Sequence, residues 1–317
     1  MKKYDVAAIG ELLIDFTCES ADASGYPLLS AHPGGAPANY LSTLAKFGME
    51  TAFIGKVGDD TFGRLLRNTL SSLSVDVSGI AVDKTVFTTL AFVTLDASGN
   101  REFAFSRKPG ADTQIRFEEM NLRQIDASSV LHFGTLSLTD EPARSSTYRA
   151  VEYARSKEKL ISFDPNLREM LWDSLADAKT QMEWGLQHAD VVKISAEECE
   201  FLWQLCPEEA AEKLIHEYGT ALAMVTKGAE GSVLSNGKYT VSVPALNVRA
   251  VDTTGAGDIF GGSAMYQFLR LQKRICDLSA DDLFSIGHFA SVTAGLSTEK
   301  KGGISSIPCL PEVQERL

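Results

Sequence analysis

The sequence predicts an α/β fold in which a mainly parallel sheet carries helices on both faces. Short apolar runs typical of buried strands alternate with longer segments of helical periodicity along most of the 317 residues. The chain is 44% hydrophobic and 23% charged, a composition typical of a globular protein with a sizeable core. No internal repeat or linker interrupts the alternation, so we expect one large α/β domain with a small β insertion.

The first elements follow one another in the order strand, helix, strand, helix. The apolar run Tyr4–Ile9 predicts a buried first strand, which residues 11–16 continue with polar interruptions. The glycine-rich segment 34–39 leads into a helix, residues 51–54 predict a second strand, and an amphipathic helix follows residues 58–60. This order is typical of a parallel sheet.

A small β insertion follows these elements. Residues 85–95 and 101–106 are rich in β-branched and aromatic side chains. Residues 96–100 (DASGN) have the composition of a hairpin turn. We therefore expect an antiparallel ribbon inserted into the parallel-type fold.

The alternation resumes near residue 130 and continues to the C-terminus. We expect strands at residues 130–133, 160–163, 191–194 and 221–226, and helices at residues 141–156, 175–188 and 196–218. Residues 231–235 and 239–243 predict a late hairpin, and two long helices close the chain.

Charge and cysteine usage exclude several classes of partner. The net charge is −12 and the chain has no basic run, whereas binding a nucleic-acid backbone needs a clustered positive face. The longest uncharged stretch, residues 23–45, contains three prolines and a glycine pair, so it predicts no membrane span. Asp5 and Glu11 interrupt any signal-peptide core, and the five cysteines are scattered without CxxC pairing. We expect a cytoplasmic protein that binds neither nucleic acid nor membrane.

Residues 251–258 (VDTTGAGD) combine glycines, hydroxyls and carboxylates. Gly255, Ala256 and Gly257 let successive backbone N–H groups point one way, and the apolar periodicity after them predicts a helix whose N-terminus favours a phosphate. Asp258 would lie in the first turn of this helix, where its carboxylate stays ionised and can accept a proton from an attacking hydroxyl. The alternative, from these residues alone, is that Asp258 only caps the helix.

Polar or glycine-rich groups also follow other predicted strands. They are Asp15, Gly34 and Gly35 with Asn39, residues 164–168 (DPNLR) and residues 226–231 (TKGAEG). Because the carboxyl ends of parallel strands meet at one crevice, we expect these distant segments to form one site. Arg168 would hold a phosphate there, with a surface ion pair as the alternative. No Walker loop, G-x-S-x-G or H-E-x-x-H motif occurs, and the site predicts phosphoryl transfer.

Through these stretches the chain resembles the ribokinase-like, or PfkB, family of sugar kinases over nearly its whole length. Residues 34–39 (GGAPAN) are similar to the family's first signature and residues 252–258 (DTTGAGD) to its second. Residues 107–112 (RKPGAD) and 164–168, followed by a Leu-Trp pair, are most similar to bacterial fructokinases. The resemblance implies a three-layer αβα sandwich with a mainly parallel sheet and a small β-sheet lid.

The resemblance also implies how the chain is divided. Residues 1–14, 32–84 and 108–317 would form the large nucleotide-binding and catalytic domain. Residues 15–31 and 85–107 would form the β lid over the sugar site, which in many members also makes the contact of a homodimer.

Functional roles carry over at the positions that match the family's motifs. The catalytic base matches Asp258, and the anion hole for the transferring phosphoryl group matches Gly255, Ala256 and Gly257. The sugar contacts match Asp15, Gly34, Gly35 and Asn39. The nucleotide loop matches Thr226, Gly228 and Gly231.

The metal positions contain one departure from the family. Its Asn-x-x-Glu motif, which organises Mg²⁺ and the phosphates, reads SAEE at residues 195–198. Glu198 keeps the magnesium-linked role, through water, while Ser195 offers the nucleotide a shorter reach and no amide. Asp252 and Thr254 match positions that hold a monovalent cation in several members. The implied cofactors are therefore ATP and Mg²⁺, with K⁺ as a further candidate.

The expected substrate is D-fructose, which ATP would convert to fructose 6-phosphate. Asp15 and Asn39 would hydrogen-bond the hydroxyls of a neutral ketose, while Arg107 and Arg168 are the cations expected near the substrate. Arg107 would bind a hydroxyl or a carboxylate equally well, so 2-keto-3-deoxygluconate is the first alternative substrate. Other sugars and nucleosides are further alternatives. A sugar-binding regulator without catalysis is the alternative of another class, which the retained Asp258 and glycine turn disfavour.

Overall fold

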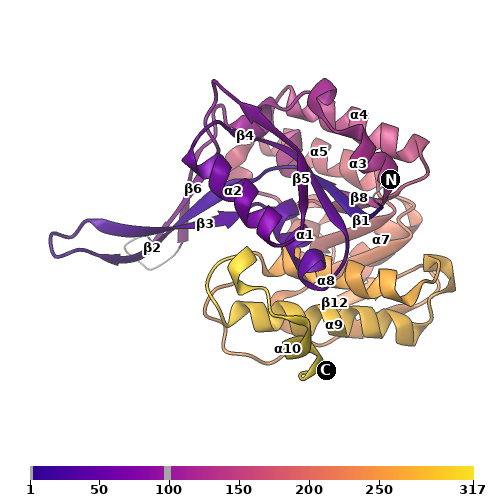
Figure 1. The fold of residues 1–317 in the computed structure, drawn as a ribbon. Coiled ribbons are helices and arrows are strands. Elements are labelled where there is room, and N and C mark those ends of the chain that lie inside the picture. The colour runs from indigo at the N-terminus through magenta and orange to yellow at the C-terminus, as the bar shows by residue number, and fades with distance from the viewer. Residues whose placement is uncertain (1–2, 96–100) are drawn as a thin grey trace.

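A nine-stranded sheet forms the centre of the computed structural model, which describes residues 3–95 and 101–317 (Figure 1). In spatial order the strands are β13 (Thr240–Val243), β12 (Ser232–Ser235), β11 (Leu222–Thr226), β10 (Val191–Ser195), β9 (Leu160–Asp164), β8 (Ser128–Gly134), β1 (Tyr4–Ile9), β4 (Thr51–Gly58) and β5 (Asp76–Asp83). Neighbours from β11 to β5 are parallel, and β12 and β13 run antiparallel. The predicted α/β class with a mainly parallel sheet is confirmed.

Helices cover both faces of this sheet, which gives the three layers expected. One face packs against α1 (Ala36–Lys46), α2 (Thr61–Ser72), α8 (Ala256–Leu271), α9 (Ala280–Thr298) and α10 (Leu310–Gln314). The other packs against α3 (Leu122–Ala127), α4 (Ala143–Ser156), α5 (Leu175–His188), α6 (Ala196–Trp203) and α7 (Pro207–His216). Strand β1 serves both cores, because Val6 and Ala8 pack on the first face and Ala7 and Ile9 on the second. Burial on both faces explains its continuous apolar run.

A separate four-stranded sheet has the order β3 (Pro27–Gly34), β2 (Leu13–Ala21), β6 (Leu90–Leu95) and β7 (Arg101–Ser106). Strands β6 and β7 pair antiparallel, as expected for the predicted ribbon, and β2 pairs with β6 in parallel. The turn predicted at residues 96–100 lies outside the described residues. The far ends of β2 and β3, residues 17–30, project from the body and are called the arm here (Figure 1).

Two strand predictions need correction. Residues 11–16 do not continue the first strand, because the chain leaves the large sheet after Ile9 and β2 begins at Leu13 in the small sheet. Residues 85–89 are not extended into a strand either. The backbone N–H groups of Thr85 and Val86 donate to the Asp83 carboxylate at 2.9 Å, and that of Thr88 donates to Asp60 at 2.8 Å. These side-chain acceptors take the place of a neighbouring strand.

The helix predicted over residues 196–218 is two helices, α6 and α7. Gln204 ends α6 in a left-handed conformation with φ 57°. Pro207 begins α7, where its missing N–H has no helical partner to lose. Among the described residues, no helix has both the length and the apolar character needed to cross a bilayer.

Candidate active site

The first turn of α8 lies between two cavities. The acidic cavity, of about 390 Å³, is lined by Asp258 and Gly255 together with residues of β2, α1 and the loop after β9. The apolar cavity, of about 450 Å³, is lined by Ala256 and Gly257 together with residues 226–231, 245–250 and α9. Thr253 lines both. A group bound in one cavity is therefore separated from the other by a single helical turn.

The backbone at Gly255 positions Asp258. Gly255 is the N-cap of α8 with φ 74°, a conformation that favours glycine, and a Cβ there would lie 3.0 Å from Asn39 Nδ2. The turn buries Asp258, whose Oδ2 accepts a hydrogen bond from Asn39 at 2.8 Å and whose Oδ1 accepts one from Asn166 at 3.2 Å. The predicted residues Asp258, Gly255 and Asn39 are thus brought together, with both carboxylate oxygens held in place.

Burial dominates the electrostatics of Asp258 and raises the pKa of its carboxyl. The hydrogen bond from Asn39 and the charges of Lys193 and Arg168 oppose this shift. A raised pKa brings a carboxylate closer to the range in which it takes up a proton during turnover. The buried Asp258 carboxylate, held by two amides, therefore differs from a solvated helix cap and is chemically able to accept a proton.

Asp15 lies across the acidic cavity on β2, within the small sheet. Burial raises the pKa of Asp15 to about 7, with Asp258 and Asp252 acting in the same direction and Arg168 against them. Gly34, at the end of β3, does not line the cavity itself. A Cβ on Gly34 would overlap Asp15 Oδ2, so the absence of a side chain leaves room for the carboxylate.

Glu11 is a lining residue that the sequence reasoning missed. It is 2% exposed, and its Oε1 accepts the N–H of Ala36 at 2.7 Å, which fixes the start of α1. Burial raises the pKa of Glu11 to about 7. Gly35 lines the cavity beside it, and a Cβ there would lie 2.5 Å from the Glu11 carbonyl oxygen. An acidic residue between Gly10 and an apolar run was the available signal.

Arg107 does not line the acidic cavity, contrary to the expectation of a substrate contact. Its buried guanidinium donates to Asp112 at 2.9 Å, to the hydroxyl of Thr139 at 2.7 Å and to the carbonyl of Leu136 at 2.7 Å. These bonds use the donors of all three guanidinium nitrogens inside the protein. Arg107 therefore supports the cavity wall at Leu136 instead of reaching into the cavity.

Arg168 is the expected cation that does reach the acidic cavity. Its Nη1 donates to the carbonyl of Leu167 at 3.0 Å, and the side chain is exposed. Its charge lowers the pKa values of Asp15 and Asp258 against the effect of burial. Asn166, two residues earlier, was missed as a site residue although its segment was singled out, and its left-handed φ of 46° aims the amide at Asp258.

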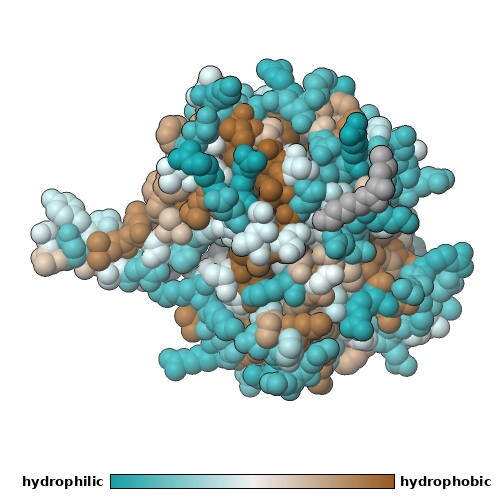
Figure 2. Space-filling view, in the orientation of Figure 1, coloured by the Kyte–Doolittle hydropathy of each residue, from teal (hydrophilic) through white to brown (hydrophobic). Residues whose placement is uncertain are grey.

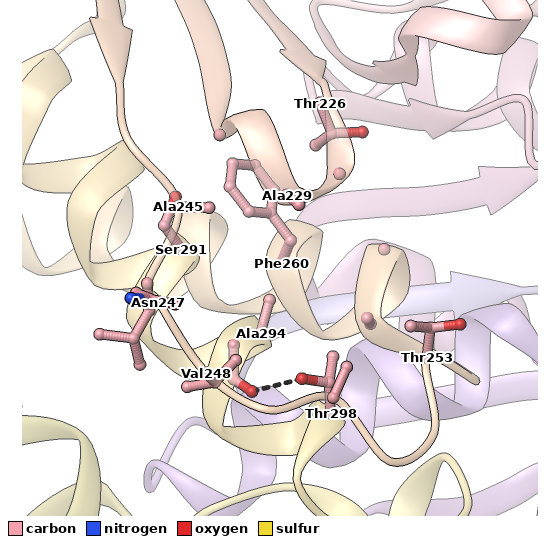
Figure 3. A pocket seen from close by; sticks show the side chains of 17 residues that line it. Thr226, Ala229, Ala245, Asn247, Val248, Thr253, Phe260, Ser291, Ala294 and Thr298 are labelled. Carbon is pink, nitrogen blue, oxygen red and sulfur yellow. Dashed lines mark hydrogen bonds between the residues drawn. The ribbon is translucent and has the colours of Figure 1, made fainter.

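The predicted nucleotide loop lines the apolar cavity. Thr226, Gly228 and Gly231 approach it from the end of β11, and Figure 3 shows Phe260 and Ala229 among the side chains that converge there. Gly231 has φ 96°, and a Cβ there would overlap the Val243 carbonyl. The lining is mainly apolar, which suits a planar ring. Gly257, in the first turn of α8, also lines this cavity, and the N-terminus of a helix favours an anion.

Ser195 and Glu198 form a capping box at the start of α6. Ser195 Oγ accepts the N–H of Glu198 at 3.2 Å, and Glu198 Oε2 accepts the N–H of Ser195 at 2.8 Å. Glu198 Oε1 accepts the N–H of Leu167 at 2.7 Å, so this carboxylate joins α6 to the loop after β9. Burial, and then the negative charge of Asp164, raise the pKa of Glu198.

Asp252 organises the loop before α8. Its Oδ1 accepts bonds from the N–H and hydroxyl of Thr254 at 2.9 and 2.7 Å, and its Oδ2 accepts the N–H of Gly302 at 2.9 Å. Thr254 lines the acidic cavity. In the described part of the chain, no three His, Cys, Asp or Glu side chains gather as a metal site.

Comparisons with known proteins identify relatives of this chain. The profile of the pfkB family carbohydrate kinases matches residues 3–310. Probable fructokinase-3 of Arabidopsis thaliana is 40% identical over 96% of this chain and 88% of its own length. Fructokinase-1 of Zea mays is 39% identical over 98% and 97%.

Solved structures give the same result. The fructokinase of Xylella fastidiosa with bound ATP has a TM-score of 0.91 at 29% identity, covering 99% of this chain and 98% of its own. The fructokinase of Vibrio cholerae O395, in a form bound to fructose, ADP and calcium ion, has a TM-score of 0.86 at 29% identity and 99% coverage of both chains.

Proposed function

The chain belongs to the pfkB family of carbohydrate kinases, and from this premise we propose that it is an ATP-dependent fructokinase that forms fructose 6-phosphate. The observation that carries the proposal is the single turn of α8 between two cavities, with Asp258 on one side and Ala256 and Gly257 on the other. The sugar would bind in the acidic cavity and ATP in the apolar one. The γ-phosphoryl group would meet the sugar hydroxyl at the turn.

In this mechanism Asp258 accepts the proton of the attacking hydroxyl. The hydroxyl oxygen forms a bond to the γ-phosphorus, the bond from that phosphorus to the bridging oxygen breaks, and ADP carries away the electron pair. The N–H groups of the Gly255–Gly257 turn and the N-terminus of α8 stabilise the negative charge on the moving group. Asn39 and Asn166 hold the base in the orientation that reaches the hydroxyl.

The residues present fit Mg²⁺ held through water. Both oxygens of Glu198 already accept backbone N–H bonds, so the carboxylate would contact a bound water rather than the ion itself. The raised pKa of Glu198, due to burial and then Asp164, supports a cation near this carboxylate. Mg²⁺ would neutralise the phosphate charge during transfer.

We also propose Asp252 and Thr254 as the position of a monovalent cation such as K⁺. The Asp252 carboxylate is tied down by Thr254 and Gly302, so the ion would depend largely on backbone carbonyls near it. Its effect on the reaction would be to hold the loop that leads into the glycine turn.

The sugar itself is inferred from the lining of the acidic cavity. Asp15, Asn39 and Asn166 offer acceptors and donors in pairs, as the hydroxyls of a neutral ketose require. The guanidinium group of Arg107 is hydrogen-bonded inside the protein, so Arg168 is the one cation among the described residues that line the acidic cavity. A keto acid such as 2-keto-3-deoxygluconate would have to rely on Arg168 alone.

The deciding experiment measures kcat/KM by ADP release for fructose, 2-keto-3-deoxygluconate, ribose and glucose side by side. We expect fructose to be preferred. A keto acid that exceeds fructose by tenfold or more would overturn the assignment. Sugar binding without any ADP release would identify a regulator without catalysis.

Sugar affinity is predicted to depend on pH through Asp15. Its pKa is about 7, and only the ionised carboxylate accepts hydrogen bonds from two sugar hydroxyls, so affinity should rise as pH rises through 7. We expect fructose to bind roughly tenfold more weakly at pH 6 than at pH 8 by calorimetry, with proton release on binding. Asp15→Asn should abolish the dependence. The pKa of Glu11 is also about 7, so Glu11→Gln is the control: this variant should retain the pH dependence of fructose affinity.

We further propose a cytoplasmic homodimer in which the arms make the contact. The five cysteines are free, in keeping with a reducing compartment. The arm carries Tyr26, Leu28 and Leu29 at 70%, 51% and 38% exposure, and Figure 2 shows apolar surface on it. Such surface on a projecting hairpin favours pairing with a second copy.

The dimer predicts a specific defect. Leu28→Asp should give a monomer by light scattering at micromolar concentration, because it places a charge in the apolar contact. Leu175→Asp is the matched control, since Leu175 is 47% exposed but lies on α5, away from the arm. A dimer that persists in Leu28→Asp, or a monomeric wild type, would contradict the proposal.

A further inference from the structure

Lys193 is a buried cation at the centre of the large sheet. It is the third residue of β10, and its side chain is only 9% exposed. Val192 and Ile194 on either side pack in the core beneath α3–α7, so Lys193 points to the opposite face, toward α1 and α8. A buried ammonium group is unfavourable unless opposite charges compensate it. An apolar side chain would suit this strand better, so the charge itself needs an explanation.

The ammonium group is fixed between two partners. Its Nζ lies 3.0 Å from Asp164 Oδ2, with both side chains buried. On its other side it touches the first turn of α8, since a Cβ on Gly257 would lie 2.9 Å from Nζ. Gly257 lines the cavity proposed for ATP, and the next residue is Asp258. The positive charge therefore lies directly behind the turn where the phosphoryl group would pass.

Several charged and titratable groups surround this cation and Asp258. They are Asp15 on β2, Tyr40 on α1, His132 on β8, Asp164 on β9, Arg168 in the loop after β9, and Glu198 on α6. Burial, and then the charge of Lys193, lower the pKa of His132 to about 3, and burial raises the pKa of Tyr40. Both rings are therefore neutral at working pH. Lys193 therefore compensates the negative charges of these carboxylates, and among the groups named here Arg168, which is exposed, is the other cation.

The cluster keeps Lys193 charged. Burial by itself lowers the pKa of this amine, but Asp164, Glu198 and Asp258 together raise it above its ordinary value. The reciprocal effect of Lys193 on Asp258 is to lower the pKa that burial raises.

We propose that Lys193 is a positioning residue for phosphoryl transfer, whose ammonium group, held behind Gly257 by Asp164, supplies a fixed positive charge beside the proposed base Asp258. The inference rests on the proposed function, because it takes Asp258 as the base. Lys193, on β10, would thus influence the reaction through Asp258 without touching the sugar or ATP. It also explains why Gly257 has no side chain, since the space is filled by the ammonium group.

The test compares Lys193→Met, Asp164→Asn and the double variant. Lys193→Met removes the cation, so the apparent pKa of Asp258 should move upward. Asp164→Asn removes a nearby negative charge and should move the pKa of Asp258 downward. The double variant should fall near the wild type, because the two effects oppose one another.

The apparent pKa of Asp258 is read in the ligand-free enzyme from carboxyl ¹³C NMR, assigned with Asp258→Asn. Opposite shifts in the two single variants support the proposal, since general damage to the fold would not produce them. A uniform loss of activity in Lys193→Met with an unmoved titration would overturn it. So would shifts of the same sign in both variants.

Two features keep the test decisive. If Lys193→Met fails to fold because Asp164 is left unpaired, the double variant compared with Asp164→Asn measures the same loss of charge without leaving the Asp164 carboxylate unpaired. If the wild type phosphorylates no sugar at all, the proposed function fails before any variant is compared. An unmoved titration in an active enzyme overturns the role of Lys193 alone.

Discussion

Asp258→Asn is expected to lower kcat by at least ~10²-fold while fructose and ATP still bind. The amide keeps the shape of the carboxylate but has only one acceptor oxygen, so it keeps the bond from one of Asn39 and Asn166, and it cannot accept the proton of the attacking hydroxyl. The fold should survive the change, because the Asn39 amide can turn over and accept from the new NH2 group with its Oδ1, which has no partner in the wild type. Single-turnover kinetics and calorimetric binding of each substrate measure the two properties separately.

A matched control tests the alternative that Asp258 only caps a helix. Asp282 lies in the first turn of α9 and accepts the N–H of Ser279 at 2.8 Å, so Asp282→Asn weakens a real capping interaction by removing the carboxylate charge. It should reduce the free energy of unfolding by about 1 kcal/mol and leave kcat unchanged. If Asp258→Asn behaved in the same way, with near-normal turnover, the mechanism would be wrong.

Gly34→Ala is expected to reduce kcat/KM for fructose by ~10- to 100-fold with little effect on nucleotide affinity. The added Cβ overlaps Asp15 Oδ2 and displaces the carboxylate from the acidic cavity. The apolar cavity has no residue near this position, so ADP binding should be normal. Steady-state kinetics with fructose varied, together with calorimetry for ADP, separate the two effects.

A double-mutant cycle shows whether Gly34 acts through Asp15. Once Asp15→Ala has removed the carboxylate, adding Gly34→Ala should cost almost nothing more. Fully additive losses would mean that the methyl group disturbs the chain in some other way. Thermal unfolding of the four proteins checks that the comparison is made between folded states.

Patterns set by the backbone could be predicted from the sequence, and side-chain partners could not. The alternating apolar runs predict β1 and the parallel sheet because burial on both faces leaves no polar alternation to read. The Gly255–Gly257 turn could be predicted because glycine, helix periodicity and a carboxylate are local signals. Strand β2 was misplaced because its first residues are as apolar as those of β1, and only tertiary contacts decide which sheet they join.

Arg107 and Lys193 show the same limit within the site. The sequence shows a cation near a substrate motif at Arg107, but Asp112 and Thr139 take up its donors, and nothing local reveals that choice. Lys193 gave a signal, a charge inside the apolar strand Val191–Ser195, yet its partners Asp164 and Gly257 lie far away in the chain. Electrostatic roles of buried residues depend on such distant neighbours.

The two cavities draw on different stretches of the chain, and this makes the protein modular. The apolar cavity is built within residues 226–298, whereas the acidic cavity takes most of its wall from residues 11–39, 93–105 and 136–168. The two sets meet in residues 253–258, of which Thr253 lines both cavities. Substitutions in residues 11–39, 93–105 and 136–168 can therefore change the cavity proposed for the sugar while the cavity proposed for ATP keeps its lining.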